Sequence, residues 1–315
     1  MQHARAHARC YLSLSITFSQ CFGHHTGATV KKIADAYQKH ATMAEPPVEA
    51  HQAGEVEQNM AQLRACAPDV RMKALSSKII CRWAPKSGAG VEDPPPGAKL
   101  VHFIRHGEGF HNVAQREWRT DPNWDGNSEP YTIDNDPDGR YMDAELNEKG
   151  RAQAVALQEQ TEPALKPALL VLSPMRRATL TGLLAFEAHV ARGDMPVIAH
   201  ELLHERAGRH TCDRRLPKAE LARLYPQVTY PEDLMPSETD PYWGDGWTRE
   251  PWETTASRAA AFTEWLFSRS ETHVAVACHS AILLALFNAV LECEDESLRT
   301  WFGTGEMRSV LLTRG

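Results

Sequence analysis

The sequence lacks several features that mark particular classes of protein. It contains no run of about 20 apolar residues, the length that a helix needs to cross a bilayer, so we predict no membrane partner. Positive charge is not in excess either. The 34 Lys and Arg residues are outnumbered by 41 Asp and Glu residues, which gives a formal net charge of −7 and argues against a nucleic-acid partner.

Cysteine is scarce as well. Seven cysteines are spread over 315 residues, an odd number without a Cys-x-x-Cys pair. This spacing argues against a zinc ribbon, a redox dithiol and a secreted scaffold held by disulfides. Fifteen histidines are present, but most are scattered along the chain. We therefore predict no metal site and no cofactor.

The first hundred residues differ in composition from the rest. Residues 1–34 contain no Asp or Glu but carry Lys, Arg and Ser, a composition typical of organellar transit peptides. Two locations follow: the cytoplasm if this segment is only a tail, or a mitochondrion or plastid if it targets the chain. Prolines and small residues over 44–97 predict a linker with a short helix over 55–65. We expect a largely irregular extension over 1–97 and one folded domain over 98–315.

Apolar runs of strand length alternate with helical patterns in the second part of the chain. Strands are expected over 100–104, 168–172, 197–203, 273–277 and 310–313, and helices over 147–160, 175–189, 254–268 and 281–291. This alternation predicts an α/β fold: a single doubly wound domain with a mainly parallel central sheet flanked by helices. In such sheets, ligands bind beyond the carboxyl ends of the strands.

Residues suited to phosphate chemistry follow the first strand directly. Arg105, His106 and Gly107 stand at its end, and Asn112 follows six positions after the histidine. A guanidinium gives phosphoryl oxygens two planar donors, and its charge favours a neutral, nucleophilic imidazole nearby. Gly107 lets the backbone bend and a substrate approach closely.

Three other strand ends carry related groups. The second strand ends in Ser-Pro-Met-Arg-Arg-Ala at 173–178, where an arginine at a helix start would bind an anion. The third leads to Glu205, a carboxylate able to transfer protons, and the fourth runs into His279. Four strand ends with such groups predict one active site.

These segments together resemble the histidine phosphatase superfamily, also called phosphoglycerate mutase-like. The resemblance covers 98–315 and is carried by Arg105-His106-Gly107 with Asn112, by segment 173–178, by His279 and by Asp-Ala-Glu-Leu-Asn-Glu-Lys-Gly at 143–150. Segments 201–208, 212–215 and 247–250 resemble the plant and fungal phosphoglycerate mutase-like phosphatases more specifically.

The resemblance implies the fold just described and a metal-independent phosphatase that acts on a small-molecule phosphate ester. His106 would attack phosphorus to form a phosphohistidine, which water would then hydrolyse. Glu205 would act as general acid and then as general base. His279 would complete the catalytic set and help to hold the phosphoryl oxygens. The predicted phosphate-binding residues are Arg105, Asn112, Arg177 and His279.

Two of these assignments involve a choice between neighbours. In the superfamily the arginine directly before the Ala of segment 173–178 binds phosphate, so we prefer Arg177 and interpret Arg176 as a solvated cation. Glu108 and Glu201 are other candidates for the acid. We prefer Glu205, because a proton donor must reach the leaving group from across the crevice.

The sequence departs from the superfamily's mutases in two places. Mutases carry Glu-Arg-His-Tyr-Gly around the acid and His-Gly-Asn after the late histidine, whereas this chain has Glu205-Arg-Ala-Gly and His279-Ser-Ala. Hydrolysis is therefore preferred; mutase-type phosphoryl transfer and a non-catalytic binder of phosphorylated partners remain alternatives. Two insertions rich in Asp and aromatic residues, 118–143 and 230–252, are interpreted as a lid or as surface excursions.

Overall fold

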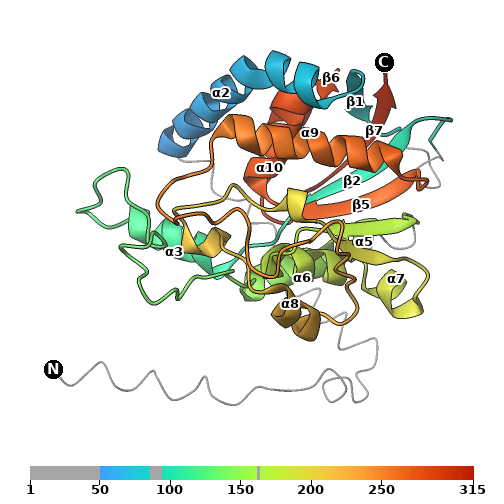
Figure 1. Ribbon diagram of the computed structural model, residues 1–315. Coiled ribbons are helices and arrows are strands. Elements are labelled where there is room, and N and C mark those ends of the chain that lie inside the picture. The colour runs from blue at the N-terminus through green and yellow to red at the C-terminus, as the bar shows by residue number, and fades with distance from the viewer. Residues whose placement is uncertain (1–49, 86–93, 162–163) are drawn as a thin grey trace. The chain divides into compact units, whose positions relative to one another are not determined.

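The central feature of the fold is a sheet that is mostly parallel. The computed structural model describes residues 50–85, 94–161 and 164–315; the predicted targeting segment lies outside them. Within this part of the chain the strands follow the order β4-β3-β5-β2-β7-β1-β6 (Figure 1). Their bounds are β1 (Ile79–Trp83), β2 (Lys99–Arg105), β3 (Leu169–Leu172), β4 (Val197–Ala199), β5 (His273–Cys278), β6 (Glu292–Cys293) and β7 (Met307–Arg314).

Among the described strands, β7 alone runs against its neighbours, β2 and β1, and the other neighbouring pairs are parallel. Helices cover both faces of the sheet (Figure 1). One face carries α2 (Ala50–Ala74), α9 (Trp252–Ser268), α10 (Ser280–Ala285) and the π-helical turn η3 (Leu286–Val290). The other carries α4 (Glu148–Ala156), α5 (Gln158–Thr161), α6 (Arg176–Ala185) and α7 (Glu187–Arg192). The predicted doubly wound α/β fold is confirmed.

The remaining elements are short and lie in the connections. They are α3 (Phe110–Arg119), α8 (Lys218–Leu224) and the 3-10 turns η1 (Glu201–Leu203), η2 (Thr211–Asp213) and η4 (Glu296–Arg299). None of the helices in the described ranges is long and apolar enough to cross a membrane.

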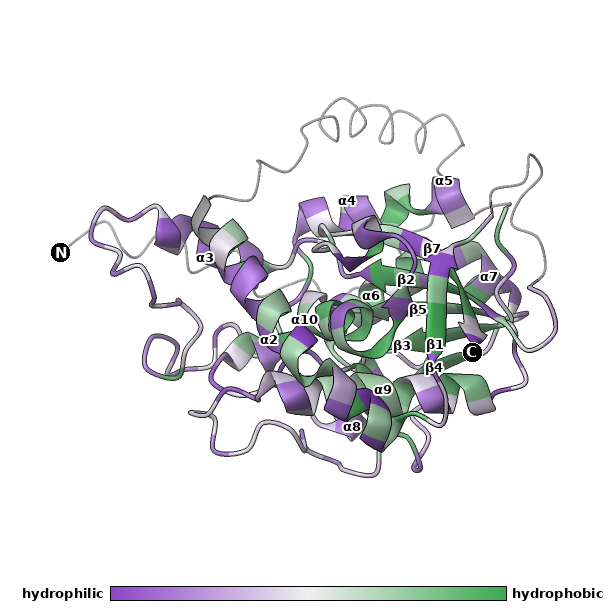
Figure 2. Cartoon of the chain, turned by 90° about the horizontal axis from the view of Figure 1, so that it is seen from above, coloured by the Kyte–Doolittle hydropathy of each residue, from purple (hydrophilic) through white to green (hydrophobic). Residues whose placement is uncertain are grey.

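The sheet is buried on both faces, as its covering helices require. Every residue of β2 is buried, and its side chains alternate between two apolar clusters: Phe103 joins the cluster beneath α9 and α10, and Ile104 joins the cluster beneath α6. Phe103 meets Phe287 of η3 edge-on, with ring centroids 5.5 Å apart. Figure 2 shows hydrophobic residues concentrated in these central strands. Burying each such ring contributes about 2 kcal/mol.

The folded domain begins earlier than the predicted boundary at residue 98. Helix α2 places Leu63 and Val70 in the main apolar cluster, and β1 adds a strand to the sheet, with Cys81 opposite Leu312 of β7. Residues 50–83 therefore belong to the domain and are not a linker. The sequence did not predict α2 as part of the domain, because the buried stripe of this helix is narrow and Pro68 stands inside it.

Some predicted elements end sooner than expected. The strand predicted over 197–203 stops at Ala199, because His200 accepts a hydrogen bond from the Leu202 amide through Nδ1 and starts the turn η1. The helices predicted over 147–160 and 175–189 are each divided, at Leu157 and Phe186. The early end of β4 matters for function, because η1 leads directly into Glu205.

The loop after β2 packs tightly against the start of α4. A Cβ atom on Gly107 would lie 2.3 Å from the carbonyl oxygen of Gly150, and one on Gly150 would lie 2.1 Å from the carbonyl oxygen of Glu108. The missing side chain at Gly107 thus makes room for α4. The expectation that it also lets a substrate approach closely stays a prediction.

This close approach predicts a large effect of a small substitution. Gly150→Ala should lower the free energy of unfolding by about 2 kcal/mol or more, because the added methyl group meets backbone that cannot move aside. Urea unfolding measures the change. Gly54→Ala is the matched control, since a Cβ on Gly54 in α2 meets nothing within 4 Å. Equal stability of the two variants would contradict this description of the loop.

Candidate active site

His106 is buried at the end of β2 with its ring orientation fixed. The residue is 2% exposed, and its Nδ1 lies 2.7 Å from the carbonyl oxygen of Gly107. A carbonyl oxygen only accepts hydrogen bonds, so Nδ1 carries the proton and Nε2 keeps its lone pair. Burial and then the charges of Arg177 and Arg105 hold the pKa of His106 well below its ordinary value. The ring is therefore a neutral imidazole with a nucleophilic Nε2.

Arg177 lies in the first turn of α6 and is 1% exposed. Its guanidinium donates to the carbonyl oxygen of Cys212 at 2.7 Å and to Oδ1 of Asp213 at 2.8 Å. Its Nε has no partner among the described residues. A buried guanidinium with a free donor beside a nucleophilic imidazole is suited to a phosphoryl oxygen.

Arg105 brings a second guanidinium to His106. It is the last residue of β2 and donates to the carbonyl oxygen of Phe302 at 2.5 Å, with its guanidinium 5.5 Å from the ring centre of Trp301. These contacts fix the side chain, while its charge acts on the imidazole of His106.

His279 meets His106 from the neighbouring strand. It follows β5, is fully buried, and its ring centroid lies 5.1 Å from that of His106. Its Nε2 is 2.7 Å from Oγ of Ser173, and its Nδ1 has no partner in the described part of the chain. Burial and the charge of Arg177 hold the pKa of His279 well below its ordinary value. We call Arg105, His106, Arg177 and His279 the phosphoryl cup.

Glu205 lies beside the phosphoryl cup, and its carboxylate contacts the first residues of α10. Its carboxylate accepts from the backbone amide of Ala281 at 3.2 and 3.3 Å, from Oγ of Ser280 at 3.3 Å and from the amide of Arg206 at 2.7 Å. The residue is 6% exposed. Because Ser280 directly follows His279, the carboxylate and the cup occupy the same region.

The two other candidate acids are held in ion pairs. Glu108 accepts from Arg116 at 3.0 Å and from Lys149 at 3.1 Å. Burial would raise the pKa of Glu108, but its hydrogen bonds outweigh burial and hold it below its ordinary value. Glu201 meets Arg215 through both carboxylate oxygens, each at 2.8 Å. Both carboxylates are therefore engaged by cationic side chains.

Arg176 is not the solvated cation that the sequence predicted. Its guanidinium donates to Oε1 of Glu145 and to the carbonyl oxygen of Asp143, at 2.5 and 2.9 Å. Its backbone amide also donates to Oδ1 of Asp143. Arg176 is a structural tie between α6 and the loop before α4.

Asn112 and a residue that the sequence analysis missed share the first turn of α3. The Oδ1 atom of Asn112 accepts from the amide of Gly109 at 2.9 Å, which fixes the side chain. His111 is buried, its ring centroid lies 5.6 Å from that of His106, and its Nδ1 has no partner in the described ranges. Burial and Arg177 keep its pKa well below the ordinary value. In the sequence, the position of His111 next to Asn112 was the only indication that His111 belongs to the site.

Asp213 and Arg249 were also missed as site residues. Asp213 bridges Arg177 and Arg249, with an oxygen 2.8 Å from each guanidinium. Burial would raise the pKa of Asp213, but the charges of these arginines and the contact with His210 hold it well below its ordinary value. A buried carboxylate thus orients Arg177 and offsets part of the positive charge. Both residues stood in segments that carried the family resemblance, without an assigned role.

The first insertion is tied to the site. Tyr131 is 4% exposed, and its ring centroid lies 6.2 Å from that of His111 and 4.9 Å from that of His210. Thr211 donates to the Tyr131 carbonyl oxygen through its amide and to Oδ2 of Asp136 through Oγ1. The insertion therefore covers the edge of the site and is not a free surface excursion.

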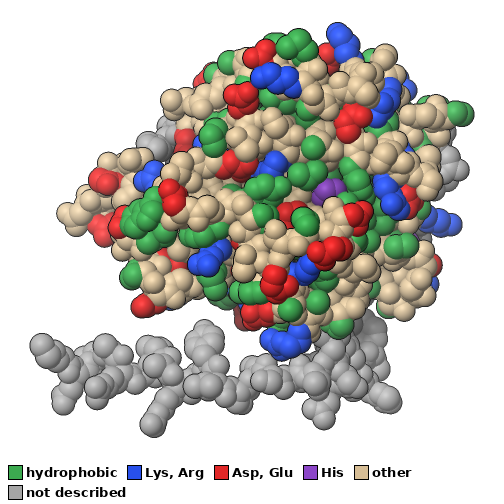
Figure 3. Space-filling model, viewed as in Figure 1, with side chains coloured by type: hydrophobic (Ala, Val, Ile, Leu, Met, Phe, Trp, Pro, Cys, Tyr) green, Lys and Arg blue, Asp and Glu red, His purple; other side chains and the backbone are tan. Residues whose placement is uncertain are grey.

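Two cavities lie beside these insertions. A cavity of about 390 Å³ is lined by Tyr242, Trp243 and neighbouring residues, and one of about 360 Å³ by Phe110, Arg140 and the residues around them. Neither is lined by the phosphoryl cup, which is enclosed. Figure 3 shows acidic and basic side chains interspersed over one face of the molecule. No group of three or more His, Cys, Asp or Glu able to hold a metal ion occurs within the described ranges.

A doubly wound sheet with two histidines and two arginines at its strand ends defines a protein of phosphoryl transfer or hydrolysis. The family model of the histidine phosphatase superfamily, branch 1, matches residues 134–313, so the chain belongs to that family. The match covers Arg177, Glu205 and His279 and begins after His106.

Several known proteins are similar to this chain in sequence or in fold. An Arabidopsis thaliana "Phosphoglycerate mutase-like protein" is 28% identical, over 69% of this chain and 86% of that protein. A Schizosaccharomyces pombe protein named a probable phosphatase is 26% identical, over 62% of this chain and 81% of that protein. Among solved structures, a phosphoglycerate mutase from Bacillus anthracis matches with a TM-score of 0.44 and 15% identity, over 71% of this chain and 93% of that one.

Proposed function

We propose that this protein hydrolyses phosphate monoesters of small molecules without a metal ion, through a phosphohistidine on His106. The observation that carries the proposal is the hydrogen bond from Nδ1 of His106 to the Gly107 carbonyl oxygen. It leaves Nε2 as the nucleophile, in a ring kept neutral by burial and by Arg177 and Arg105.

In the first step, Nε2 of His106 attacks phosphorus and the bond from phosphorus to the ester oxygen breaks. Arg105, Arg177 and His279 bind the phosphoryl oxygens and spread their charge, and the amide group of Asn112 adds a neutral donor. The leaving oxygen takes a proton from the carboxyl group of Glu205. Positive charge comes from the guanidinium groups, so the step requires no metal ion.

In the second step, water replaces the alcohol. The carboxylate of Glu205 removes a proton from the water, the water oxygen attacks phosphorus, and the bond from phosphorus to Nε2 breaks. Inorganic phosphate leaves, His106 returns to its neutral form, and Glu205 is protonated again for the next turn.

One observation favours the mutase alternative. The cup is enclosed, with His106 2% exposed and His279 fully buried, and a mutase must protect its phosphohistidine from water. Mutase-type transfer would return the phosphoryl group to a second position of a phosphorylated acceptor that stays in the site. The same cup would support both reactions.

The test is to supply purified full-length protein with a panel of phosphate esters in the presence of a metal chelator. We expect inorganic phosphate from p-nitrophenyl phosphate, with unchanged kcat when the chelator is present. A second reaction supplies 3-phosphoglycerate and its bisphosphate cofactor. Formation of 2-phosphoglycerate without net phosphate release would replace hydrolysis by the mutase alternative. If folded protein turns over none of these substrates, the remaining alternative is a non-catalytic binder of phosphorylated partners.

A further inference from the structure

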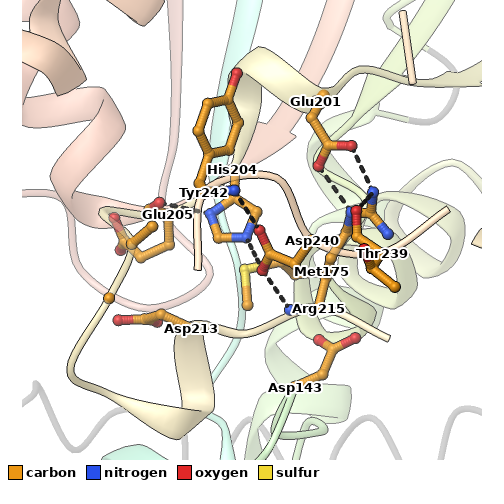
Figure 4. A network of polar contacts seen from close by, with 12 residues as sticks. Asp143, Met175, Glu201, His204, Glu205, Asp213, Arg215, Thr239, Asp240 and Tyr242 are labelled. Carbon is orange, nitrogen blue, oxygen red and sulfur yellow. Dashed lines mark hydrogen bonds and ion pairs between the residues drawn. The ribbon is translucent and has the colours of Figure 1, made fainter. Parts of the chain in front are cut away.

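The residue before the proposed acid is a buried histidine with two acceptors. His204 is fully buried; its Nε2 lies 2.9 Å from Oδ2 of Asp240, and its Nδ1 lies 2.7 Å from the carbonyl oxygen of Glu205 (Figure 4). A carbonyl oxygen and a carboxylate both require a donor. A neutral imidazole has only one N–H, so both contacts are satisfied only when His204 is an imidazolium.

Asp240 is held as a carboxylate that can pair with this cation. Its Oδ2 also accepts from the Arg215 amide and its Oδ1 from the Tyr242 amide, both at 2.9 Å. Burial would raise the pKa of Asp240, but the charge and the hydrogen bond of His204 outweigh burial and lower the pKa to about 2. The pair therefore ties the segment that carries Glu205 to the second insertion.

A second cation holds the same backbone from α9. Arg258 pairs with both oxygens of Glu250, at 2.8 and 2.7 Å, and donates to the carbonyl oxygens of His204 at 3.0 Å and Glu205 at 3.2 Å. The carbonyl oxygen of Glu205 thus receives donors from two cations. Of the two side chains, the imidazole of His204 is the one that can titrate near neutral pH.

We propose that His204 and Asp240 form a positioning pair that sets the backbone of Glu205, so that its carboxyl group reaches the leaving oxygen only while His204 is protonated. The proposal rests on the proposed function, because it needs Glu205 as the acid and base. It adds to activity an alkaline limit that is set by His204.

The direction of the pH effect follows from the surroundings of His204. Burial and Arg258 lower its pKa, but the charge and hydrogen bond of Asp240 and the charge of Glu201 outweigh them and raise the pKa to about 8. Because the folded value lies above the ordinary one of 6.5, the contact stabilises the site fully below about pH 6.5 and is lost as pH rises through about 8. The groups facing His204 are Glu201, Glu205, Asp240, Tyr242, Glu250, Arg258 and His279.

The test is the pH profile of kcat from pH 6 to 10, with an alkyl phosphate as the substrate with a poor leaving group. Wild type should lose activity with a midpoint near pH 8. Asp240→Asn should move this midpoint to lower pH by about one pH unit or more, because the paired charge is removed. His204→Gln keeps a donor for Asp240 but none for the Glu205 carbonyl oxygen. It should lower kcat about tenfold, abolish the midpoint near pH 8 and leave KM within about twofold.

His200→Asn is the matched control. His200 is a buried histidine of the same segment, and the Asn oxygen can replace its Nδ1 as acceptor for the Leu202 amide. This variant should keep the wild-type pH profile. A profile altered as in His204→Gln would show that any change in the segment has this effect and would overturn the proposal.

A second measurement does not depend on activity. Nitrogen NMR of the His204 ring, assigned through His204→Gln, should show both nitrogens protonated at pH 7 and a midpoint near 8 in wild type. A neutral His204 at pH 7 would overturn the proposal, whether or not the variants fold. Turnover with an unshifted midpoint in Asp240→Asn would also overturn it. Absence of turnover in wild type would instead contradict the proposed function.

Discussion

Replacing His106 by Ala should lower kcat by about 10⁴-fold or more, because the substitution removes the nucleophile while the cationic groups remain in place. The ring of His106 is held by the Gly107 carbonyl oxygen and lies beside His279, at a centroid distance of 5.1 Å. His279, whose Nε2 contacts Oγ of Ser173, is retained in this variant. Steady-state release of p-nitrophenol measures the loss, and far-ultraviolet circular dichroism checks the fold.

The control for this prediction is His200→Ala. It removes another buried imidazole that packs on Phe262 and Trp265 outside the cup, so kcat should stay within about threefold of wild type even where stability falls. Similar residual activity in the two variants would remove His106 from the mechanism.

The effect of Glu205→Gln should depend on the leaving group. An alkyl phosphate leaves as a strongly basic alkoxide and needs a proton, so its hydrolysis should slow by about 10²–10⁴-fold. For p-nitrophenyl phosphate, whose leaving group is a stable anion, formation of the phosphohistidine should slow far less. Single-turnover kinetics isolate this step from the later hydrolysis, in which Glu205 acts as base. The glutamine keeps an acceptor oxygen for the amide of Ala281, so α10 should be little disturbed.

Glu108→Gln supplies the comparison. It neutralises the carboxylate that directly follows the histidine motif, whose ion pairs with Arg116 and Lys149 face α3 and α4. Its effect should be the same for both substrates. Equal slowing of the two substrates in Glu205→Gln would exclude Glu205 as the acid. Dependence on the leaving group in Glu108→Gln would assign the acid to Glu108.

The parts of the site that the sequence could predict are those fixed by local rules. His106 and His279 each directly follow a short, mainly apolar strand. Because β2 and β5 are parallel neighbours with Arg105 opposite Cys278, the two histidines had to emerge side by side. Arg177 follows the same logic at the start of α6. The sequence predicted that these strand ends converge; the catalytic roles remain for experiment.

The rest depends on contacts between distant segments, which leave no periodic signal. Asp213 reaches Arg177 from a loop 36 residues further along the chain, and His204 meets Asp240 at the same separation. Neither loop has a secondary-structure pattern that places it at the cup. Strand β1 was missed for a similar reason: its five residues pair with β7, at the far end of the chain.

Trapping the covalent intermediate tests the mechanism most directly. Wild-type protein would be mixed for milliseconds with a substrate carrying radioactive phosphate, stopped in alkali, digested and mapped by mass spectrometry. We expect alkali-stable, acid-labile phosphate on the peptide that contains His106, formed faster than phosphate is released. Label on another residue, or steady hydrolysis without any bound label, would contradict nucleophilic attack by His106.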